Sequence, residues 1–548
     1  MDGCLIVQFA HSMIALVHPS SVKQAILSSI TSFILALIST QYSALTTVGN
    51  AQDIVLAFGI HLISLFCSVF IYRISPFHPL SSFPGPILPK ITKFWGVSQS
   101  WTGRQHRTFL HLHEIYGPFV RTGPNELSIA HAQAVNDVLG AGGLDKGEWY
   151  SARQDPNAPK NLIVLTGEAH ANRRRLWNRA LSNENLTAYQ PVIANRIDEL
   201  VRHLVQVAAQ SEIVDIGQSI AYFTFDFMGD MAFGGPFHML SDGGDKNDFW
   251  GMLNRFAISA SVVSHIPWAF PLVQAIPSLS KDLRRLRRFG VESATGRLQE
   301  GSKTKDLWYH LSDEAELEKM RPLPPNVVAD GALAVIAGAD TTAGALTALI
   351  YFVLSDATTY HKLRNEVDTV YPAGSDATDA TLHDRLVWMD ACINETLRLQ
   401  PPVPTNGPRQ VSYDGHGVII AGRYVPPGTQ VYVPPYAIHR DARYFSPSPE
   451  CFLPSRWLPH TPEPEHPDGG FVLDRSAFIP FSYGPANCVG RHLARMEMKM
   501  VLSVLVQKFN LQFAEDFDSK GWCDTIKDYL VTSRGPLVVK LTPRDGSL

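Results

Sequence analysis

Cysteine and net charge, two features that often indicate the class of a protein, are both low in this sequence. Only six cysteines occur in 548 residues, and their scattered spacing argues against a disulfide framework. The formal net charge is only −4 and no basic tract occurs, which argues against a nucleic acid or an acidic substrate as partner. The composition therefore predicts a protein of a reducing compartment with no nucleic-acid partner.

A usable dinucleotide-binding loop is also missing. The nearest candidate is Gly140-Ala141-Gly142-Gly143, but Asp145 stands where the third glycine of such a loop should be. No convincing helix follows the segment either. We therefore expect neither a flavin domain nor a nicotinamide domain, so electrons for redox chemistry must come from another protein.

One apolar run near the N-terminus has the length that a bilayer core requires. It extends from Ile54 to Tyr72 and holds 19 nearly uncharged residues. A buried core helix is the alternative, but the prolines at positions 76, 79, 84 and 86 and the basic residues that follow argue against it. By the positive-inside rule, these basic residues put the rest of the chain in the cytosol. They are Arg73, Lys90, Lys93, Arg104 and Arg107.

Two shorter apolar stretches, Leu5–Val17 and Ala25–Ser39, precede this run. Residues 1–75 are therefore predicted to be a membrane anchor of one to three transmembrane helices. One or three crossings put the N-terminus in the lumen, and two crossings put it in the cytosol. If all three stretches cross, Lys23 lies in the cytosol. A cleaved signal peptide is disfavoured because Asp2 replaces its basic start.

The rest of the chain is predicted to form a hinge and one domain. Residues 76–90 are the proline-rich hinge. A chain of this length usually forms several domains, but no linker-like change in composition follows residue 90. We therefore expect residues 91–548 to form one large, mainly helical catalytic domain.

A cysteine in a tight Gly/Pro loop precedes an amphipathic helical pattern near the C-terminus. The loop reads FSYGPANCVG, from Phe481 to Gly490. Unpaired N–H groups and the macrodipole at a helix N-terminus favour an anion, so Cys488 is expected to be stabilised as a thiolate. Gly484 and Gly490 let the backbone approach a flat partner, and Phe481 can lie over the cysteine. A structural cysteine in a turn is the alternative.

This spacing of one phenylalanine, two glycines and a cysteine resembles the haem-ligand loop of the cytochrome P-450 family. The resemblance implies haem b as cofactor, with Cys488 as the axial ligand of its iron. It also implies the P-450 fold, mainly α with small β-sheets. The haem would lie between an oxygen-activating helix and the cysteine-ligand loop. One position departs from the family pattern: Ala486 stands where many members have an arginine that contacts a haem propionate.

A possible ion-pair group lies about ninety residues before the cysteine. Glu395 and Arg398 stand three residues apart and share a helix face, so they can pair. An exposed pair of this kind stabilises a protein little. Together with Arg456 they resemble the Glu-Arg-Arg triad of the family. The resemblance implies a structural role, in which the triad ties the helix to the loop that bears the cysteine.

A long apolar helical pattern, roughly Val327 to Leu354, contains the polar segment AGADTT. An acid, hydroxyls and a glycine are costly in a buried helix unless they have a function. A kink with back-bonded threonines is the alternative. The segment resembles the oxygen-activating helix of the family. The resemblance implies that Gly338 and Ala339 leave room for dioxygen. It further implies that Thr341 hydrogen-bonds the oxygen and that Asp340 supplies protons.

Three basic or imidazole side chains match positions that hold the haem propionates in the family. His170 and Arg174 stand one helical turn apart, and many members have tryptophan where this chain has His170. Arg409 matches a second contact. Arginine pairs with carboxylates through charge-assisted, forked hydrogen bonds. Because Ala486 cannot contribute, the propionate charge is expected to be left to these three residues.

The resemblance implies a haem-thiolate monooxygenase that uses O2 to hydroxylate or otherwise oxidise a lipophilic small molecule. An NADPH-cytochrome P-450 reductase is the expected electron donor, with cytochrome b5 as a further candidate. It would dock near the cysteine face, where Arg491 and Arg495 add positive charge. The expected location is the endoplasmic reticulum membrane, in contact with lipid, with the catalytic domain on the cytosolic side. The anchor and the cysteine loop resemble those of fungal secondary-metabolism members, so a terpenoid or similar substrate is expected.

Two other functions are open at this stage. A haem-thiolate isomerase or dehydratase uses no oxygen and does not need an acid–threonine pair, so Asp340 and Thr341 argue against it. A non-enzymatic haem sensor or carrier is the second alternative. For an enzyme, three segments are expected to line the substrate pocket, namely Gly140–Lys160, Trp250–Val262 and Pro402–Gly407.

Overall fold

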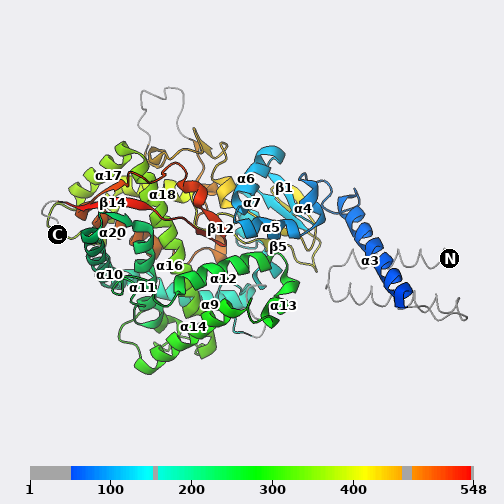
Figure 1. The fold of residues 1–548 in the computed structure, drawn as a ribbon, viewed down its shortest axis with the longest axis horizontal. Coiled ribbons are helices and arrows are strands. Elements are labelled where there is room, and N and C mark those ends of the chain that lie inside the picture. The colour runs from blue at the N-terminus through cyan, green and yellow to red at the C-terminus, as the bar shows by residue number, and fades with distance from the viewer. Residues whose placement is uncertain (1–50, 152–157, 460–471, 545–548) are drawn as a thin grey trace, which may run out of the picture.

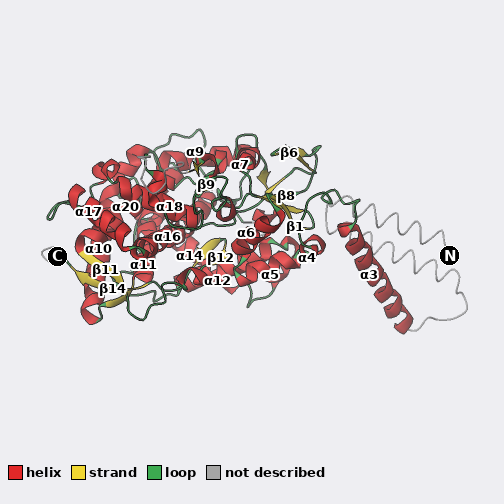
Figure 2. Ribbon diagram, turned by 90° about the horizontal axis from the view of Figure 1, so that it is seen from above, coloured by secondary structure: helices red, strands yellow, loops and turns green. Residues whose placement is uncertain are grey.

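The computed structural model describes residues 51–151, 158–459 and 472–544 of the chain. This part is mainly α-helical with several small sheets, which confirms the expected fold class (Figure 2). Helix α3 (Ala51–Ile74) projects from the body that the other elements form (Figure 1). The apolar stretches 5–17 and 25–39 lie outside the described residues.

The longer helices make up most of the body. They are α6 (Gln105–Tyr116), α9 (Gly167–Ala180), α10 (Asn183–Gln210), α11 (Ile216–Phe233), α12 (Phe249–Ser264), α14 (Lys281–Glu300), α16 (Pro324–Ser355), α17 (Ala357–Val370), α18 (Val387–Leu399) and α20 (Arg491–Lys508). Shorter helices connect them. They are α4 (Ile87–Ile91), α5 (Phe94–Thr102), α7 (Ala132–Leu139), α8 (Glu148–Ser151), α13 (Phe270–Ala275), α15 (Leu307–Leu311) and α19 (Pro435–Ile438).

Helix α16 is the central helix of the larger hydrophobic core. It begins at Pro324 and Pro325, whose missing N–H groups cost nothing in a first turn, and it packs on α11, α18 and α20. It is apolar on nearly all sides, as expected for a core helix. By length and composition it could span a membrane. However, 67% of its most apolar window is buried inside the protein, so it belongs to the core.

Five strands form the largest sheet, in the order β1-β2-β8-β5-β3. They are β1 (Phe119–Gly123), β2 (Glu126–Ile129), β3 (Asp145–Lys146), β5 (Arg409–Gln410) and β8 (Gln430–Tyr432). Only the β2–β8 pair in this sheet is parallel. This sheet lies at the end of the body nearest α3, while β11 and β14 lie at the opposite end (Figure 2).

The remaining strands form one three-stranded sheet and three pairs. The three-stranded sheet has the order β11-β14-β4, with β4 (Ile213–Asp215), β11 (Phe509–Phe513) and β14 (Val538–Pro543). The pairs are β6 (Val418–Ile420) with β7 (Arg423–Val425), β9 (Phe445–Ser446) with β10 (Val472–Leu473), and β12 (Lys527–Tyr529) with β13 (Val531–Ser533).

The segment expected to be a hinge packs closely onto the largest sheet. Leu80 and Phe83 are buried in the hydrophobic core on this sheet. The carbonyl oxygen of Pro84 accepts a hydrogen bond from the N–H of Arg121 in β1, at 2.7 Å. Residues 80–84 are therefore fixed to the body, whereas α3 before them has helix α4 as its main neighbour.

Candidate active site

The loop before α20 is shaped by a close backbone contact. Gly484 has φ +70°, and a Cβ atom there would lie 2.0 Å from the carbonyl oxygen of Leu139 at the end of α7. Only glycine satisfies both constraints. On the other side of the loop, the N–H of Cys488 donates to the carbonyl of Phe481 at 2.8 Å. The Phe481 side chain is partly buried against the larger core. These contacts fix the backbone around Cys488.

The thiol of Cys488 is accessible to solvent even though protein surrounds it. Burial among these atoms raises its pKa, while the N–H of Gly490 and the charges of Arg174 and Arg491 lower it. Burial is the largest of these effects, so the expected thiolate is not stabilised by the helix N-terminus alone. A bound metal ion would remove the thiol proton outright. A side chain that is both surrounded and accessible lies in a hollow of the protein.

The chain leaves space beside this thiol. Apart from its two chain neighbours, a Cβ atom built on Gly490 would meet one heavy atom of the described residues within 4 Å, the Sγ of Cys488 at 4.0 Å. A planar group could therefore approach both the sulfur and the backbone of Gly490. This observation fits a haem whose iron is bound by Cys488, as the family resemblance implies.

A cluster of basic side chains lies near the cysteine loop. Arg174, on α9, donates to the carbonyl oxygen of Asn487 at 2.6 Å and to its Oδ1 at 2.7 Å. Its positive charge lowers the pKa of His170, of Lys146 and of the Cys488 thiol. We call this group the cation cluster; its members are Lys146, His170, Arg174 and Arg409. Among the described residues, none of these four forms an ion pair.

His170 and Arg409 differ in what they can offer an anion. Burial, with the charges of the other cluster members, lowers the pKa of His170 to about 4. Its imidazole is therefore neutral near pH 7 in this environment and can offer an N–H donor, and its expected role at a haem propionate stays a prediction. The Arg409 side chain is buried, and its Nε has no hydrogen-bond partner among the described residues. A buried donor without a partner is costly, which favours an acceptor at this place.

The propionates of a haem fit this environment. A haem carries two carboxylates, and the cation cluster offers guanidinium and ammonium groups without a described counter-ion. Cys488 lies near Arg174 through the Asn487 contacts. The donors for iron and for carboxylate thus lie near one another, and Cys488, Arg174 and Arg409 would hold the group.

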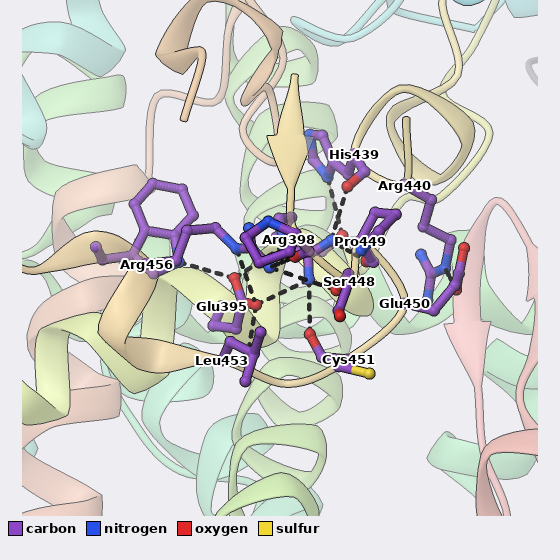
Figure 3. Close-up of polar contacts among 12 residues, drawn as sticks. Glu395, Arg398, His439, Arg440, Ser448, Pro449, Glu450, Cys451, Leu453 and Arg456 are labelled. Carbon is purple, nitrogen blue, oxygen red and sulfur yellow. Dashed lines mark hydrogen bonds and ion pairs between the residues drawn. The ribbon is translucent and has the colours of Figure 1, made fainter. Parts of the chain in front are cut away.

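Glu395, Arg398 and Arg456 lie together and are fully buried (Figure 3). Arg398 donates to the Glu395 carboxylate with both Nε and Nη2, each at 2.8 Å. The Nε of Arg456 reaches the same carboxylate at 3.4 Å. The N–H groups of Leu453 and Trp457 also donate to it, at 3.0 and 2.9 Å. These five donors compensate for the free-energy cost of removing the carboxylate from water. A buried charge without such partners would strongly destabilise the fold.

The triad joins α18 to the chain before the cysteine loop. Arg398 donates to the carbonyl oxygens of His439 and Cys451, at 2.8 and 3.0 Å (Figure 3). His439 in turn accepts from the N–H of Ile479 at 2.9 Å, two residues before Phe481. The helix that bears Glu395 is thus linked by side-chain and backbone hydrogen bonds to the approach of the cysteine loop.

Thr341 and Asp340 lie near the middle of α16, next to Ala337, which is exposed although the helix is mostly buried. The Thr341 hydroxyl donates to the carbonyl of Ala337 at 2.6 Å, as the back-bonding alternative expects, and its oxygen can still accept a hydrogen bond. Asp340 lies 3.9 Å from the Nη1 of Arg534. Burial raises the pKa of Asp340 to about 6, and Arg534 acts in the opposite direction.

Two small residues of this segment pack against neighbouring parts of the protein. A Cβ atom on Gly338 would lie 2.6 Å from the Sδ of Met228 on α11, so Gly338 allows the close packing of two helices. Ala339 is fully buried in the larger core. Ala337 is the more exposed position and Gly338 is only partly buried, so the expectation that Gly338 and Ala339 leave room for dioxygen stays a prediction.

The three segments expected to line a substrate pocket meet in the structure. Gly407 lies against Tyr150 and Trp149 of α8, so a Cβ on this glycine would come within 2.6 Å of both side chains. Helix α12, which contains the whole second segment, also packs on α8. The N–H of Thr532 in β13 donates to the carbonyl of Pro402 at 2.9 Å. Residues 152–157 of the first segment lie outside the described residues.

Two functional candidates could not be found from the sequence, namely Lys146 in the cation cluster and Arg534 beside Asp340. Neither belongs to a motif. Lys146 lies inside a segment expected to line the pocket, which gave a weak indication of its place. Arg534 lies far from Asp340 in the sequence and reaches it only through the packing of β13 against α16.

A cysteine that can bind iron, next to cations that can bind two carboxylates within a mainly helical fold, defines the class of haem-thiolate proteins. The chain belongs to the cytochrome P450 family, since the family model Cytochrome P450 matches residues 84–528.

Curated fungal proteins resemble the chain over most of its length. Cytochrome P450 67 of Uromyces fabae is 33% identical over 489 residues, which cover 86% of this chain and 88% of that protein. Cytochrome P450 monooxygenase cpaH of Aspergillus oryzae is 32% identical and covers 86% and 91% of the two chains. Tryprostatin B 6-hydroxylase of Aspergillus fumigatus is 30% identical and covers 92% and 88%.

These findings define the enzyme class. The chain is an oxidoreductase, a haem-thiolate monooxygenase that acts on small molecules. Membership of this family implies a haem cofactor, O2 as co-substrate and a redox partner that supplies electrons. The monooxygenase expectation is confirmed over the isomerase and carrier alternatives.

Proposed function

We propose that this monooxygenase oxidises a lipophilic secondary metabolite at the cytosolic face of the endoplasmic reticulum membrane. Haem b is held through Cys488, Phe481, Gly484 and Gly490 and through the cation cluster. One observation carries the proposal: the accessible Cys488 thiol lies beside cations that no described carboxylate neutralises.

The residues of the site divide the chemistry among them. When bound, the haem iron supplies the activation of O2 and the oxidation of an unactivated C–H bond. Cys488 gives its sulfur to the iron. Arg174 and Arg409 orient the propionates, and His170 can add an N–H donor. The triad of Glu395, Arg398 and Arg456 keeps the approach to the cysteine loop in place.

Asp340 and Thr341 would control protons on the opposite side of the pocket. With its pKa raised to about 6, the Asp340 carboxyl can both take up and release a proton near neutral pH. The Thr341 oxygen, next in the chain, can accept a hydrogen bond while its own proton is held by Ala337.

Helix α3 supports a membrane anchor. Its 24 residues are about 36 Å long, compared with a bilayer core of about 30 Å. Apolar side chains on its described part stand exposed, although apolar residues normally pack against other elements. They are Ile63, Phe66, Phe70, Ile71 and Ile74. A domain border near residue 75 and a location at the endoplasmic reticulum follow from this proposal.

The proposed electron donor is an NADPH-cytochrome P450 reductase, with cytochrome b5 as a second donor. Arg491 is exposed at the start of α20 and can contact an acidic partner. Arg495 is less suited than expected, because it binds Asp390 and Asn394, each at 2.9 Å. Lys499 binds the same aspartate at 3.0 Å.

The substrate is proposed to be a fungal secondary metabolite. Two relatives are named for the 6-hydroxylation of tryprostatin B, which is a small molecule. The apolar and aromatic residues where α8, α12 and residues 402–407 meet favour a lipophilic compound. A terpenoid skeleton stays a prediction.

The proposed function is tested by reconstituting the full chain with reductase, NADPH and a panel of lipophilic terpenoid and indole compounds. We expect NADPH and O2 to be consumed together, with one atom of isotopically labelled dioxygen found in the product. Product formed without consumption of either reagent would indicate an isomerase. Loss of the reaction on withholding the reductase would support the proposed donor.

A further inference from the structure

The chain from helix α3 to helix α6 carries positive charge that no nearby acid in the sequence balances. Residues 54–113 contain five lysine or arginine residues but no aspartate or glutamate. Asp53 precedes Arg73 by twenty helical residues, which is about 30 Å along α3. The carboxylate of Glu126 on β2 is already bound by Lys93. A balancing anion for the remaining cations therefore has to come from outside this part of the chain.

Three cations gather where α3 joins the body (Figure 1). They are Arg73 at the end of α3, Lys90 on α4 and Arg121 on β1, and we call them the anchor cluster. The Nη1 of Arg73 donates to the carbonyl oxygen of Ile91 at the end of α4. The charge of Arg73 lowers the pKa of Arg121, and the charge of Arg121 lowers the pKa of Lys90. Among the described residues, none of the three forms an ion pair.

Arg121 is a buried charge whose hydrogen-bond partners are all neutral. Its residue is only 1% exposed. Its Nε and Nη2 donate to the carbonyl oxygen of Pro124, at 3.2 and 2.9 Å, and Nε also donates to that of Gly123 at 3.4 Å. Among the described residues, Nη1 has no hydrogen-bond partner, so two N–H groups are left for another acceptor. A buried charge is costly without a counter-charge, which favours an anion at this place.

The crowding of positive charge also acts on a neighbouring imidazole. His78 is buried, and its Nδ1 accepts a hydrogen bond from the N–H of Leu80 at 3.0 Å. Burial, then the charges of Arg121 and Arg73, lower the pKa of His78 to about 4. His78 is therefore neutral near pH 7 and does not add to the charge. A bound anion would offset the repulsion among the three members of the anchor cluster.

Large apolar side chains that neighbour these cations in the sequence are exposed. They are Ile71, Ile74, Phe77, Ile87 and Leu88, of which Phe77 is 84% exposed. An inorganic anion would leave them in water, whereas a lipid would cover them with its acyl chains. Arg73 is the last residue but one of α3. If α3 spans the bilayer, the anchor cluster lies at the depth of the lipid head groups.

We propose that Arg73, Lys90 and Arg121 bind the phosphate of an anionic phospholipid in the cytosolic leaflet. The proposal rests on the proposed membrane anchor, because it requires α3 to span the bilayer. Charge-assisted hydrogen bonds hold the phosphate, and the exposed apolar side chains contact the acyl chains. Since the three cations come from α3, α4 and β1, the bound lipid also fixes the orientation of the body on the membrane.

The test uses the full-length, haem-loaded chain in detergent, with bound molecules counted by native mass spectrometry. The probes are dioctanoyl phosphatidate, dioctanoyl phosphatidylcholine and glycerol 3-phosphate. We expect phosphatidate to bind at least about tenfold more tightly than phosphatidylcholine, whose choline group neutralises the phosphate. Glycerol 3-phosphate lacks acyl chains and should bind far more weakly. If it binds as tightly as phosphatidate, the ligand is a soluble phosphate and the proposal is wrong.

Single substitutions separate a built site from general attraction between charges. Arg73→Gln and Lys90→Gln should each weaken phosphatidate binding about tenfold, and Lys90→Arg should bind as the wild type does. Arg104→Gln removes an exposed arginine of the same basic segment and is the matched control. An equal loss of affinity in Arg104→Gln and Lys90→Gln would overturn the proposal.

Folding and anchoring are measured separately. Arg73 and Lys90 are only partly buried, and the carbon monoxide spectrum of each variant reports whether the haem site is intact. Association of the wild-type chain with phosphatidylcholine vesicles tests the anchor. A protein that enters these vesicles but does not prefer phosphatidate overturns the lipid site and leaves the proposed function intact. A protein that stays in solution would overturn the anchor itself.

Discussion

The carboxylate of Asp340 lies 3.9 Å from the Nη1 of Arg534, a residue that follows strand β13. The Nε of the same arginine donates to the Thr347 hydroxyl at 3.1 Å, two helical turns further along α16. The Asp340 carboxyl is thereby linked to the hairpin β12–β13, whose Thr532 contacts Pro402 at the expected substrate pocket. A substrate that displaces this hairpin would also move the partner of Asp340.

The first prediction concerns this pair. Burial raises the pKa of Asp340 to about 6, and the positive charge of Arg534 lowers it. Arg534→Gln removes the opposing charge, so the pKa should rise further, by about one unit. The fraction of NADPH electrons that ends in product should change with pH as Asp340 titrates. In Arg534→Gln this change should therefore occur at a higher pH. Measuring product and peroxide per NADPH across the neutral pH range gives this profile.

Arg534→Lys should keep the wild-type profile, since it keeps the charge. Arg443→Gln, which removes a surface partner of Asp441, is the matched control. If Arg534→Gln lowers activity equally at every pH, the arginine only supports the fold.

The second prediction concerns Thr341 and Asp340 themselves. Thr341→Ala should retain haem but release more of the NADPH electrons as peroxide, because proton delivery would be mistimed. Asp340→Asn cannot exchange a proton and should slow turnover by about a hundredfold. Thr369→Ala, whose hydroxyl likewise donates to the carbonyl four residues earlier but on the exposed face of α17, is the control. Unchanged coupling in both site variants would remove α16 from proton delivery.

The motif residues could be predicted from the sequence because each of them needs one residue type at one spacing. Cys488 must be a cysteine to bind iron as a thiolate, and Glu395 and Arg398 must stand one helical turn apart to form their forked pair. The fold class followed from long helical patterns and from the resemblance that these residues carry.

The contacts made through packing could not be predicted in this way. Lys146 faces Arg409 because two strands far apart in the sequence share a register, and Arg534 reaches Asp340 because a hairpin packs on α16. The raised pKa of the Cys488 thiol has the same origin, since burial depends on atoms from the whole domain. The packing of Gly338 against Met228 could not be seen in the sequence either, because Met228 belongs to another helix.

The third prediction concerns the ligand of the iron. Cys488→Ala should abolish the red-shifted carbon monoxide band of the reduced protein, because only a thiolate opposite carbon monoxide produces it. Cys451→Ala changes an exposed thiol and should leave the band unchanged. A band that survives in Cys488→Ala would show that another residue binds the iron.

The fourth prediction separates the anchor from the body. Deleting residues 1–75 removes α3 and should release much of the protein from membranes while the haem spectrum persists. Deleting residues 1–90 also removes Leu80 and Phe83, which are buried in the core on the largest sheet. Each buried side chain of this size contributes about 1.5–3 kcal/mol, so the longer deletion should lower the melting temperature or prevent folding. Equal melting temperatures for the two deletions would contradict this border.

The last prediction concerns the buried triad. Glu395→Gln removes the charge that Arg398 and Arg456 share and leaves both guanidinium groups buried. Breaking a buried pair on one side costs about 3–5 kcal/mol, far more than the loss of a surface pair. We expect a large drop in the free energy of unfolding of the haem-loaded protein, measured by chemical denaturation. Glu450→Gln, which removes an exposed partner of Arg440, should cost less than about 1 kcal/mol. Similar losses in the two variants would mean that the triad does not stabilise the fold beyond an ordinary ion pair.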